Sequence, residues 1–178
     1  FFKHKTAYEI ASCLVGSEMC IRDRLSCDNG IIVNEFGKTD HANIYACGDC
    51  TNHPNKLINK KIRLESVHNA MEQSKTVASS IINKSTEYNQ IPWFWSDQYD
   101  HKLQIVGLSG EHDKVIMRGD MSEAKFMLFY TKDEKLIAVD AVNNSKEFLI
   151  CKKLVANKVT IKPDEISNPD TNLNDLIE

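Results

Sequence analysis

The sequence predicts an α+β fold in which the end of an α/β domain precedes a smaller domain with an antiparallel sheet and flanking helices. Short apolar runs within residues 31–47 lead into a helical pattern over residues 66–83. A polar stretch and Pro92 then mark a domain boundary. Beyond it, four strand-like segments bounded by Gly, Asp or Asn occur at residues 102–106, 114–118, 125–130 and 136–142, which favours an antiparallel sheet.

The composition is that of an ordinary globular protein. The 178 residues suffice for one domain or two small ones, with 42% hydrophobic and 26% charged residues and a net charge of −3. That charge gives no bias toward nucleic acid or membrane, and no apolar run approaches the length of a bilayer span. Six cysteines without framework spacing fit reduced thiols. We therefore expect a cytoplasmic protein with neither a nucleic-acid nor a membrane partner.

Residues 1–24 differ in pattern from the rest of the chain. They show no sustained period of 2 or 3.6 and no turn chemistry that leads into the segment after them. Residues 13–24 also resemble one reading frame of a transposon-library sequencing adapter. The alternative is a genuine helix carrying Leu14, Met19 and Ile21, but these positions do not form one stripe. We predict that residues 1–24 are a non-native segment.

The domain predicted for residues 25–84 contains two short strands, a loop and a helix. The strands are Ile31–Val33 and Ile44–Cys47, and the turn between them contains Gly37. A basic connector comes next at Lys56–Arg63. Apolar residues then recur at spacings of three and four, which predicts an amphipathic helix: Val67, Ala70, Met71, Val77, Ala78, Ile81 and Ile82.

The domain predicted for residues 92–178 begins with an aromatic run and continues into the four strands. A helix is expected over residues 147–157, because one helical face would carry Phe148, Cys151, Leu154 and Val155. The tail from Pro163 onward is polar and ends in a last apolar cluster at Leu173, Leu176 and Ile177.

Residues 44–50 (Ile-Tyr-Ala-Cys-Gly-Asp-Cys) carry the first of three resemblances to one family. The segment resembles the second FAD signature of the flavoprotein reductases that serve ferredoxins, rubredoxins and putidaredoxin-type carriers, which are related to the pyridine nucleotide-disulfide oxidoreductases. The resemblance implies that Gly48 lets the backbone approach FAD and that Asp49 accepts a hydrogen bond from a ribityl hydroxyl. Taken alone, a Gly-Asp pair after a strand is a common turn.

Residues 63–70 and 92–99 carry the other two resemblances. The first is similar to the family's helix that points its N-terminus at the isoalloxazine, which implies that Ser66 and Val67 lie at the flavin. Ser66 is equally suited to cap that helix. The second, Pro-Trp-Phe-Trp-Ser-Asp-Gln-Tyr, is similar to the family's flavin-covering strand. It implies that Trp95 lies near the ring, whereas Trp93 suits the core of the second domain.

The Cys47–Cys50 pair invites a redox or a zinc interpretation, and we discount both. A thioredoxin-type pair sits at a helix N-terminus, whereas this pair straddles the end of a predicted strand. Zinc needs four ligands, and only His53 lies close by in the sequence. We expect no metal site and no residue that acts as a catalytic acid or base.

The resemblance implies an enzyme that passes electrons from NAD(P)H through FAD to a ferredoxin-type iron–sulfur protein. A complete enzyme of this type has two Gly-x-Gly-x-x-Gly turns, and neither occurs in this chain. We therefore expect a C-terminal fragment that is inactive alone. Two alternatives stay open: a non-catalytic interaction or dimerisation module, and a related flavoprotein that reduces a disulfide or an oxygen species.

Basic residues near the predicted flavin-facing helix form a candidate docking patch for an acidic carrier. Lys60, Lys61 and Arg63 lie in the predicted connector, and Lys75 lies two turns into the helix. For any one of them, a solvated position that keeps the protein soluble is an equally good interpretation.

Overall fold

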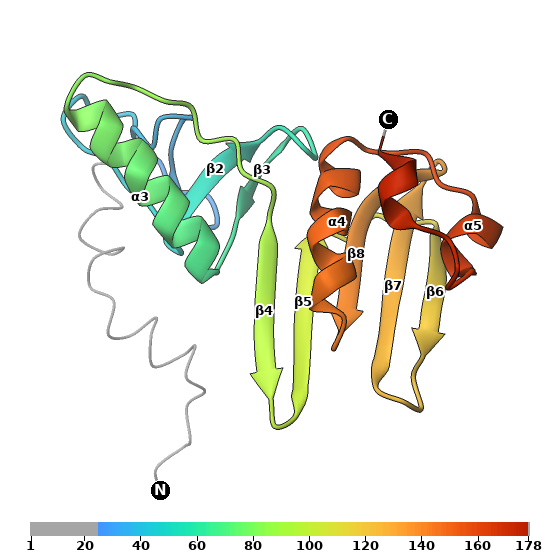
Figure 1. Ribbon diagram of the computed structural model, residues 1–178. Coiled ribbons are helices and arrows are strands. Elements are labelled where there is room, and N and C mark those ends of the chain that lie inside the picture. The colour runs from blue at the N-terminus through green and yellow to red at the C-terminus, as the bar shows by residue number, and fades with distance from the viewer. Residues whose placement is uncertain (1–24, 178) are drawn as a thin grey trace, which may run out of the picture. The chain divides into compact units, whose positions relative to one another are not determined.

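The structure is a computed structural model that describes residues 25–177, which fall into two compact units (Figure 1). Unit 1 comprises the described residues up to Glu65 together with Asn69–Asn89, and unit 2 comprises Ser66–His68 together with the chain from Gln90 onward. The prediction for residues 1–24 lies outside the described residues. Within the described range, every helix is too short or too polar to cross a bilayer.

Unit 1 is a small three-stranded sheet with one helix. Strand β1 (Ile31–Ile32) pairs in parallel with β2 (Thr51–Asn55), which pairs in antiparallel fashion with β3 (Lys60–Arg63). Helix α3 (Val67–Ile81) comes next; it begins one residue later and ends two residues earlier than predicted. A compact apolar cluster is formed by Leu25, Ile31 and Val33, with Cys27, Ile44 and Ala46 packed against it.

The strands of unit 1 differ from the prediction in two places. Residues 44–47 form no strand and make only an isolated bridge between Tyr45 and Lys38, because the backbone around them closes a local loop. The predicted basic connector instead contains β3, and its partner β2 was not predicted at all. Strand β2 holds Pro54, a residue that argues against a central strand. It is tolerated there because β1 pairs only with Thr51 and Asn52, so Pro54 has a strand on one side only.

Helix α3 buries its polar face. The side chains turned into unit 1 are Asn69, Gln73, Thr76 and Ser80, spaced four, three and four residues apart. Several residues of the predicted apolar face are more than half exposed: Val67, Met71, Ile81 and, just past the helix, Ile82. The prediction of a helix was right, but the apolar face is not the buried one, because hydrogen bonds from unit 1 hold the polar face.

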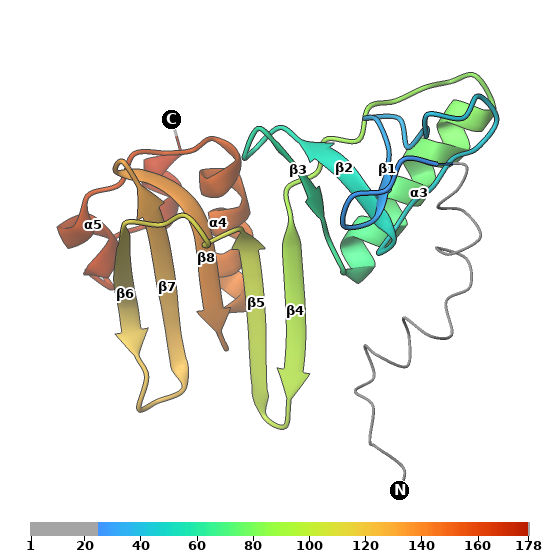
Figure 2. The ribbon, with the colours of Figure 1, turned by 180° about the vertical axis from the view of Figure 1, so that it is seen from behind.

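Unit 2 is built on a five-stranded antiparallel sheet in the order β4-β5-β8-β7-β6 (Figures 1 and 2). The strands are β4 (Trp93–Gln98), β5 (His101–Gly107), β6 (Lys114–Asp120), β7 (Lys125–Lys132) and β8 (Lys135–Val142). The four strands predicted beyond Pro92 are therefore confirmed within one or two residues at their ends.

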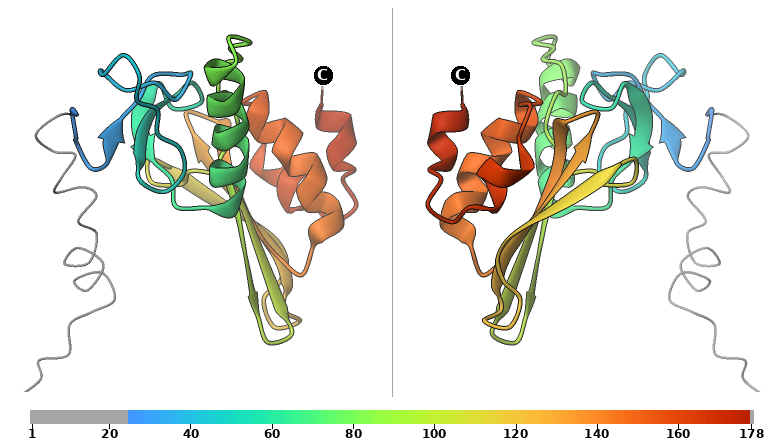
Figure 3. Two further views of the ribbon diagram at one scale, coloured as in Figure 1. Left: turned by 90° about the vertical axis from the view of Figure 1, so that its left-hand side faces the viewer. Right: turned by 90° about the vertical axis from the view of Figure 1, so that its right-hand side faces the viewer.

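Helices cover one face of this sheet, as the edge-on views in Figure 3 show. They are α4 (Ser145–Ala156), α5 (Pro163–Ser167) and the 3-10 helix η1 (Leu173–Leu176). The buried residues of α4 are Phe148, Cys151, Leu154 and Val155, which is the predicted face. The two short helices were not predicted, because the tail is mostly polar. Helix α5 buries Ile166, and η1 buries Leu173.

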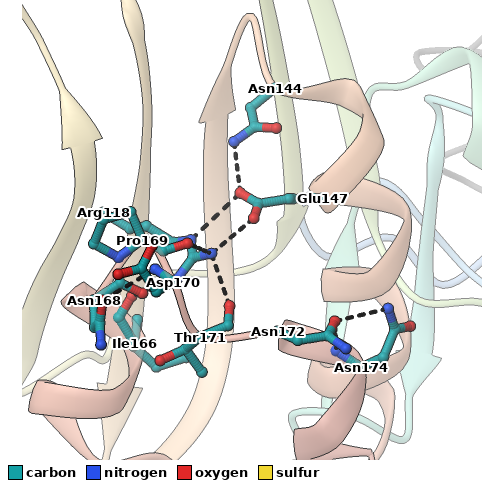
Figure 4. Close-up of polar contacts among 10 residues, drawn as sticks. All are labelled: Arg118, Asn144, Glu147, Ile166, Asn168, Pro169, Asp170, Thr171, Asn172 and Asn174. Atoms are coloured by element: carbon teal, nitrogen blue, oxygen red, sulfur yellow. Dashed lines mark hydrogen bonds and ion pairs between the residues drawn. The ribbon is translucent and has the colours of Figure 1, made fainter.

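A buried arginine joins β6 to the helices (Figure 4). The Nη2 atom of Arg118 lies 2.8 Å from Oε1 of Glu147 on α4. The guanidinium also donates to the carbonyl oxygen of Ile166 in α5 and to those of Asn168, Pro169 and Thr171 in the segment that follows α5. Partial burial alone would raise the pKa of Glu147, but hydrogen bonds from Arg118 and Asn144 hold that pKa below its ordinary value. This cluster is defined as the Arg118 clamp.

Candidate functional site

The Gly-Asp loop of unit 1 is fixed by hydrogen bonds from both sides. Gly48 is buried and has a φ of +82°, a conformation that favours glycine. Its N–H donates to Oε1 of Gln73 on α3 at 2.6 Å, and its carbonyl accepts from the N–H of Thr51 at 3.0 Å. The Thr51 hydroxyl also donates to the same Gln73 oxygen at 2.9 Å. Since both polar groups of Gly48 are used inside the protein, its direct role is to hold the loop.

The Asp49 side chain is exposed at the tip of that loop. Its backbone carbonyl accepts from Nε of Arg63 at 2.7 Å, which ties the loop to β3. Within residues 25–177, no donor bonds to the Asp49 carboxylate, whereas the backbone beneath it is held at three points. A fixed carboxylate whose acceptor sites face outward suits a ligand that carries hydroxyl groups.

Cys47 and Cys50 flank Gly48 and Asp49 in the sequence, and both are free thiols. Cys50 is exposed, and its Sγ lies 3.5 Å from the carbonyl oxygen of Cys47. Partial burial, followed by the neighbouring Cys47, raises the pKa of the Cys50 thiol, which disfavours the reactive thiolate. No group of three or more metal-ligating side chains occurs in the described part of the chain.

The first turn of α3 presents backbone donors. Ser66 directly precedes the helix, at the N-cap position. Val67 is the first residue of the helix, and it is 56% exposed. The first N–H groups of a helix have no partner within the helix, and the positive end of its dipole lies beside them. This turn therefore suits a ligand with negative charge.

In unit 2, an aromatic pair lies on β4 with a lysine above it. The rings of Trp93 and Trp95 have centroids 5.0 Å apart, and Trp95 is 41% exposed. The Nζ atom of Lys152 on α4 lies 3.4 Å from the centroid of the Trp93 ring. Trp93 also packs against Phe148 at 6.2 Å between centroids. The half-buried Trp93 thus joins the core, whereas Trp95 offers indole surface to a ligand.

The predicted docking residues are not equally available. Lys60 and Lys61 are exposed at the start of β3. Arg63 pairs with Glu65 at 2.8 Å, and Lys75 pairs with Glu72 one helical turn before it. The positive charges of Arg63 and Lys75 are therefore partly neutralised by these neighbouring acids.

Two families match this sequence. Residues 93–177 match the family described as reductase C-terminal, and residues 17–74 match the pyridine nucleotide-disulphide oxidoreductases. The chain is thus similar to the pyridine nucleotide-disulphide oxidoreductases in its first part and to the reductase C-terminal domain in its last part. The second match includes residues 17–24, whose structure lies outside the described range, so a non-native origin of residues 1–24 stays a prediction.

Curated relatives of this chain are ferredoxin reductases. Putidaredoxin reductase of Pseudomonas putida is 36% identical over 153 residues, which cover 86% of this chain and 36% of the relative. A ferredoxin–NAD(P)(+) reductase of Sphingomonas is 42% identical over 137 residues, which cover 76% of this chain and 33% of the relative. The chain spans about a third of the length of the curated relatives it matches.

Solved structures of such reductases contain the same fold. A ferredoxin reductase from Rhodopseudomonas palustris superposes with a TM-score of 0.83 at 34% identity, covering 90% of this chain and 40% of that chain. A covalent putidaredoxin reductase–putidaredoxin complex gives a TM-score of 0.84 at 34% identity, covering 91% and 39%. The predicted resemblance to ferredoxin reductases and the α+β fold class are confirmed.

Sequence reasoning missed two residues that shape this site. Gln73 holds the Gly-Asp loop. A glutamine among the polar positions of the helix could have indicated this contact, but α3 was expected to bury its apolar face. Lys152 covers Trp93 from α4, and nothing in a helix rich in lysine distinguishes it from Lys153. Such contacts depend on tertiary placement that spacing cannot supply.

Proposed function

We propose that the intact protein is an FAD-dependent reductase that passes electrons from NAD(P)H to a ferredoxin-type iron–sulfur protein, and that this chain is its C-terminal part. The observation that carries the proposal is the exposed Asp49 carboxylate on a loop fixed from α3 and β3, within a chain similar to this family. FAD supplies the step between a two-electron donor and a one-electron acceptor. The chain alone, which lacks both glycine-rich turns, is expected to be inactive.

Each proposed FAD contact has a distinct physical task. Asp49 accepts a hydrogen bond from a ribityl hydroxyl, and Gly48 sets the conformation that presents it. Ser66 and Val67 place backbone donors and the helix dipole toward the pyrimidine edge of the flavin. Trp95 covers the ring with its exposed indole. None of these residues has to move a proton, so the protein's part is to bind, orient and exclude water.

Asp49→Ala in the full-length reductase tests the proposal. A hydrogen bond to an ionised acceptor is worth about 1.5–3 kcal/mol, so FAD affinity should fall roughly ten- to hundred-fold. Asp100→Ala, in the exposed turn between β4 and β5, is the matched control and should leave FAD affinity unchanged. Affinity is measured by titrating the apoprotein with FAD and following flavin fluorescence. Unchanged affinity in Asp49→Ala would remove this residue from the site.

The partner proposal rests on charge. Lys60, Lys61, Arg63 and Lys75 would guide an acidic carrier, and such guidance is screened over a Debye length of about 8 Å at physiological salt. Reversing Lys60, Lys61 and Lys75 to glutamate should slow carrier reduction at low salt and spare NAD(P)H-dependent reduction of ferricyanide. Equal losses with both acceptors would assign these lysines to the fold or to FAD binding.

We also propose a cytoplasmic location. The support is that Cys27, Cys47, Cys50 and Cys151 are all present as free thiols, as is usual where the compartment is reducing.

A further inference from the structure

Lys152 is held in an unusual place for a lysine. Its ammonium nitrogen lies 3.4 Å from the centroid of the Trp93 ring and 5.4 Å from that of Phe148. No carboxylate among residues 25–177 forms an ion pair with it. Its neighbour Lys153 is exposed. The side chain of Lys152 is therefore partly buried against the aromatic cluster and makes no ion pair with an acid of residues 25–177.

The charge on Lys152 is poorly screened. Partial burial lowers the pKa of its ammonium group, because loss of water disfavours the charged form. A cation over an indole face is attracted by the ring quadrupole, and more strongly where it is desolvated. Because Trp93 in turn packs against Trp95 at 5.0 Å, the cation and the exposed indole belong to one contact chain.

We propose that Lys152 is a positioning residue that fixes the Trp93–Trp95 pair and whose positive charge raises the reduction potential of FAD bound beside Trp95. This rests on the proposed function, because it assigns Lys152 a role toward the same cofactor. Reduction adds electron density to the flavin, so an uncompensated cation close to the ring favours the reduced state over the oxidised state.

The first measurement uses the chain itself and needs no cofactor. The chain contains two tryptophans, Trp93 and Trp95, so intrinsic tryptophan fluorescence and near-UV circular dichroism in the tryptophan bands report this cluster alone. Lys152→Gln should change both spectra, Lys152→Arg should largely restore them, and Lys153→Gln should leave them as in the unmodified chain. Spectra of Lys152→Gln that match the unmodified chain would overturn the positioning role.

The second measurement is the midpoint potential of FAD in the full-length reductase. Lys152→Gln should lower it by about 30 mV, equivalent to a tenfold change in the equilibrium of a two-electron couple. Lys152→Met should do the same if the glutamine variant is unstable, whereas Lys152→Arg and Lys153→Gln should keep the potential. An unchanged potential in variants that still bind FAD overturns the inference and leaves the proposed function standing. A full-length protein that binds no FAD would instead overturn the proposed function and, with it, this inference.

Discussion

The interiors of the two units are built from different chemistry. Unit 2 encloses a continuous apolar core that includes Met127, Phe129, Leu136, Phe148 and Leu154, all fully buried. The buried side chains of unit 1 are largely polar and include Thr51, Asn52, His53, Asn69 and Gln73. Burying a large apolar side chain contributes about 1.5–3 kcal/mol, whereas a typical hydrogen bond contributes a net of about 0.5–1.5 kcal/mol. Unit 1 therefore depends on individual directional contacts, and unit 2 depends on packing.

The difference extends to how buried polar groups are satisfied. Arg118 of unit 2 is 5% exposed and donates to Glu147 and to four backbone carbonyls. In unit 1, three buried polar atoms have no hydrogen-bond partner within the described residues: Oδ1 of Asn52 and both ring nitrogens of His53. Polar groups left unpaired inside a protein reduce stability. The polar interior of unit 1 is thus stabilised at the Gly-Asp loop and weakened at β2.

The largest effect is expected from Arg118→Met in unit 2. Removing the arginine leaves four carbonyl oxygens without this donor and leaves Glu147 with Asn144 as its remaining donor, and breaking a buried pair destabilises by about 3–5 kcal/mol. Urea unfolding followed by the fluorescence of Trp93 and Trp95 would report unit 2. Glu147→Gln keeps the buried arginine and its carbonyl contacts, so it should lose less. A loss below about 1 kcal/mol for Arg118→Met would show that packing alone holds this unit.

Gln73→Leu should give the next largest effect, in unit 1. It deprives the Gly48 N–H of its acceptor, whereas the Thr51 hydroxyl can still donate to the Gly48 carbonyl at 2.8 Å, and leaving one buried donor unpaired costs about 1–3 kcal/mol. Amide hydrogen exchange should speed up in residues 47–51 and stay unchanged in β7 of unit 2. The matched control Gln98→Leu alters an exposed position on β4. No change in the loop would mean that Gln73 is not what fixes Asp49.

Sequence reasoning succeeded where periodicity follows packing. The strands of unit 2 are apolar segments bounded by turn residues, β7 buries alternate side chains, and α4 carries one apolar face, so local pattern and buried surface agree. In unit 1 they disagree, because α3 buries Asn69 and Gln73 while Met71 is exposed. The Asp49 loop could be found from a resemblance, but its support from Gln73 could not, since the two lie far apart in the sequence.

The burial of Arg118 could have been predicted from the alternation of buried positions along β6. Arg118 shares a strand face with Ile116, two residues before it, and Ile116 belongs to the core. A charged residue in register with a core position implies a buried partner, although the sequence does not say which one. The same signal was absent for Lys152, because a helix surface tolerates lysine at any exposed position.

The smallest expected effect concerns His53 of β2 and depends on pH. The ring is 1% exposed, meets the ring of Tyr88 edge-on at 5.1 Å between centroids, and has no hydrogen-bond partner within residues 25–177. Burial lowers the pKa of His53 below its ordinary value of 6.5, so the folded protein keeps the ring neutral. Below about pH 6.5 the unfolded chain binds a proton that the folded chain does not bind. The free energy of unfolding therefore decreases as the pH is lowered. The decrease ends at the folded pKa, below which both states are protonated.

His53→Phe keeps an aromatic ring beside Tyr88 and should abolish this part of the pH dependence. The exposed His41→Gln in the same unit should retain it. Hydrogen exchange of the β2 amides, corrected for its intrinsic pH dependence, measures the effect. An equal loss of protection in His53→Phe and the unmodified chain on acidification from about pH 7.5 to about 5.5 would show that another group limits the acid stability of unit 1.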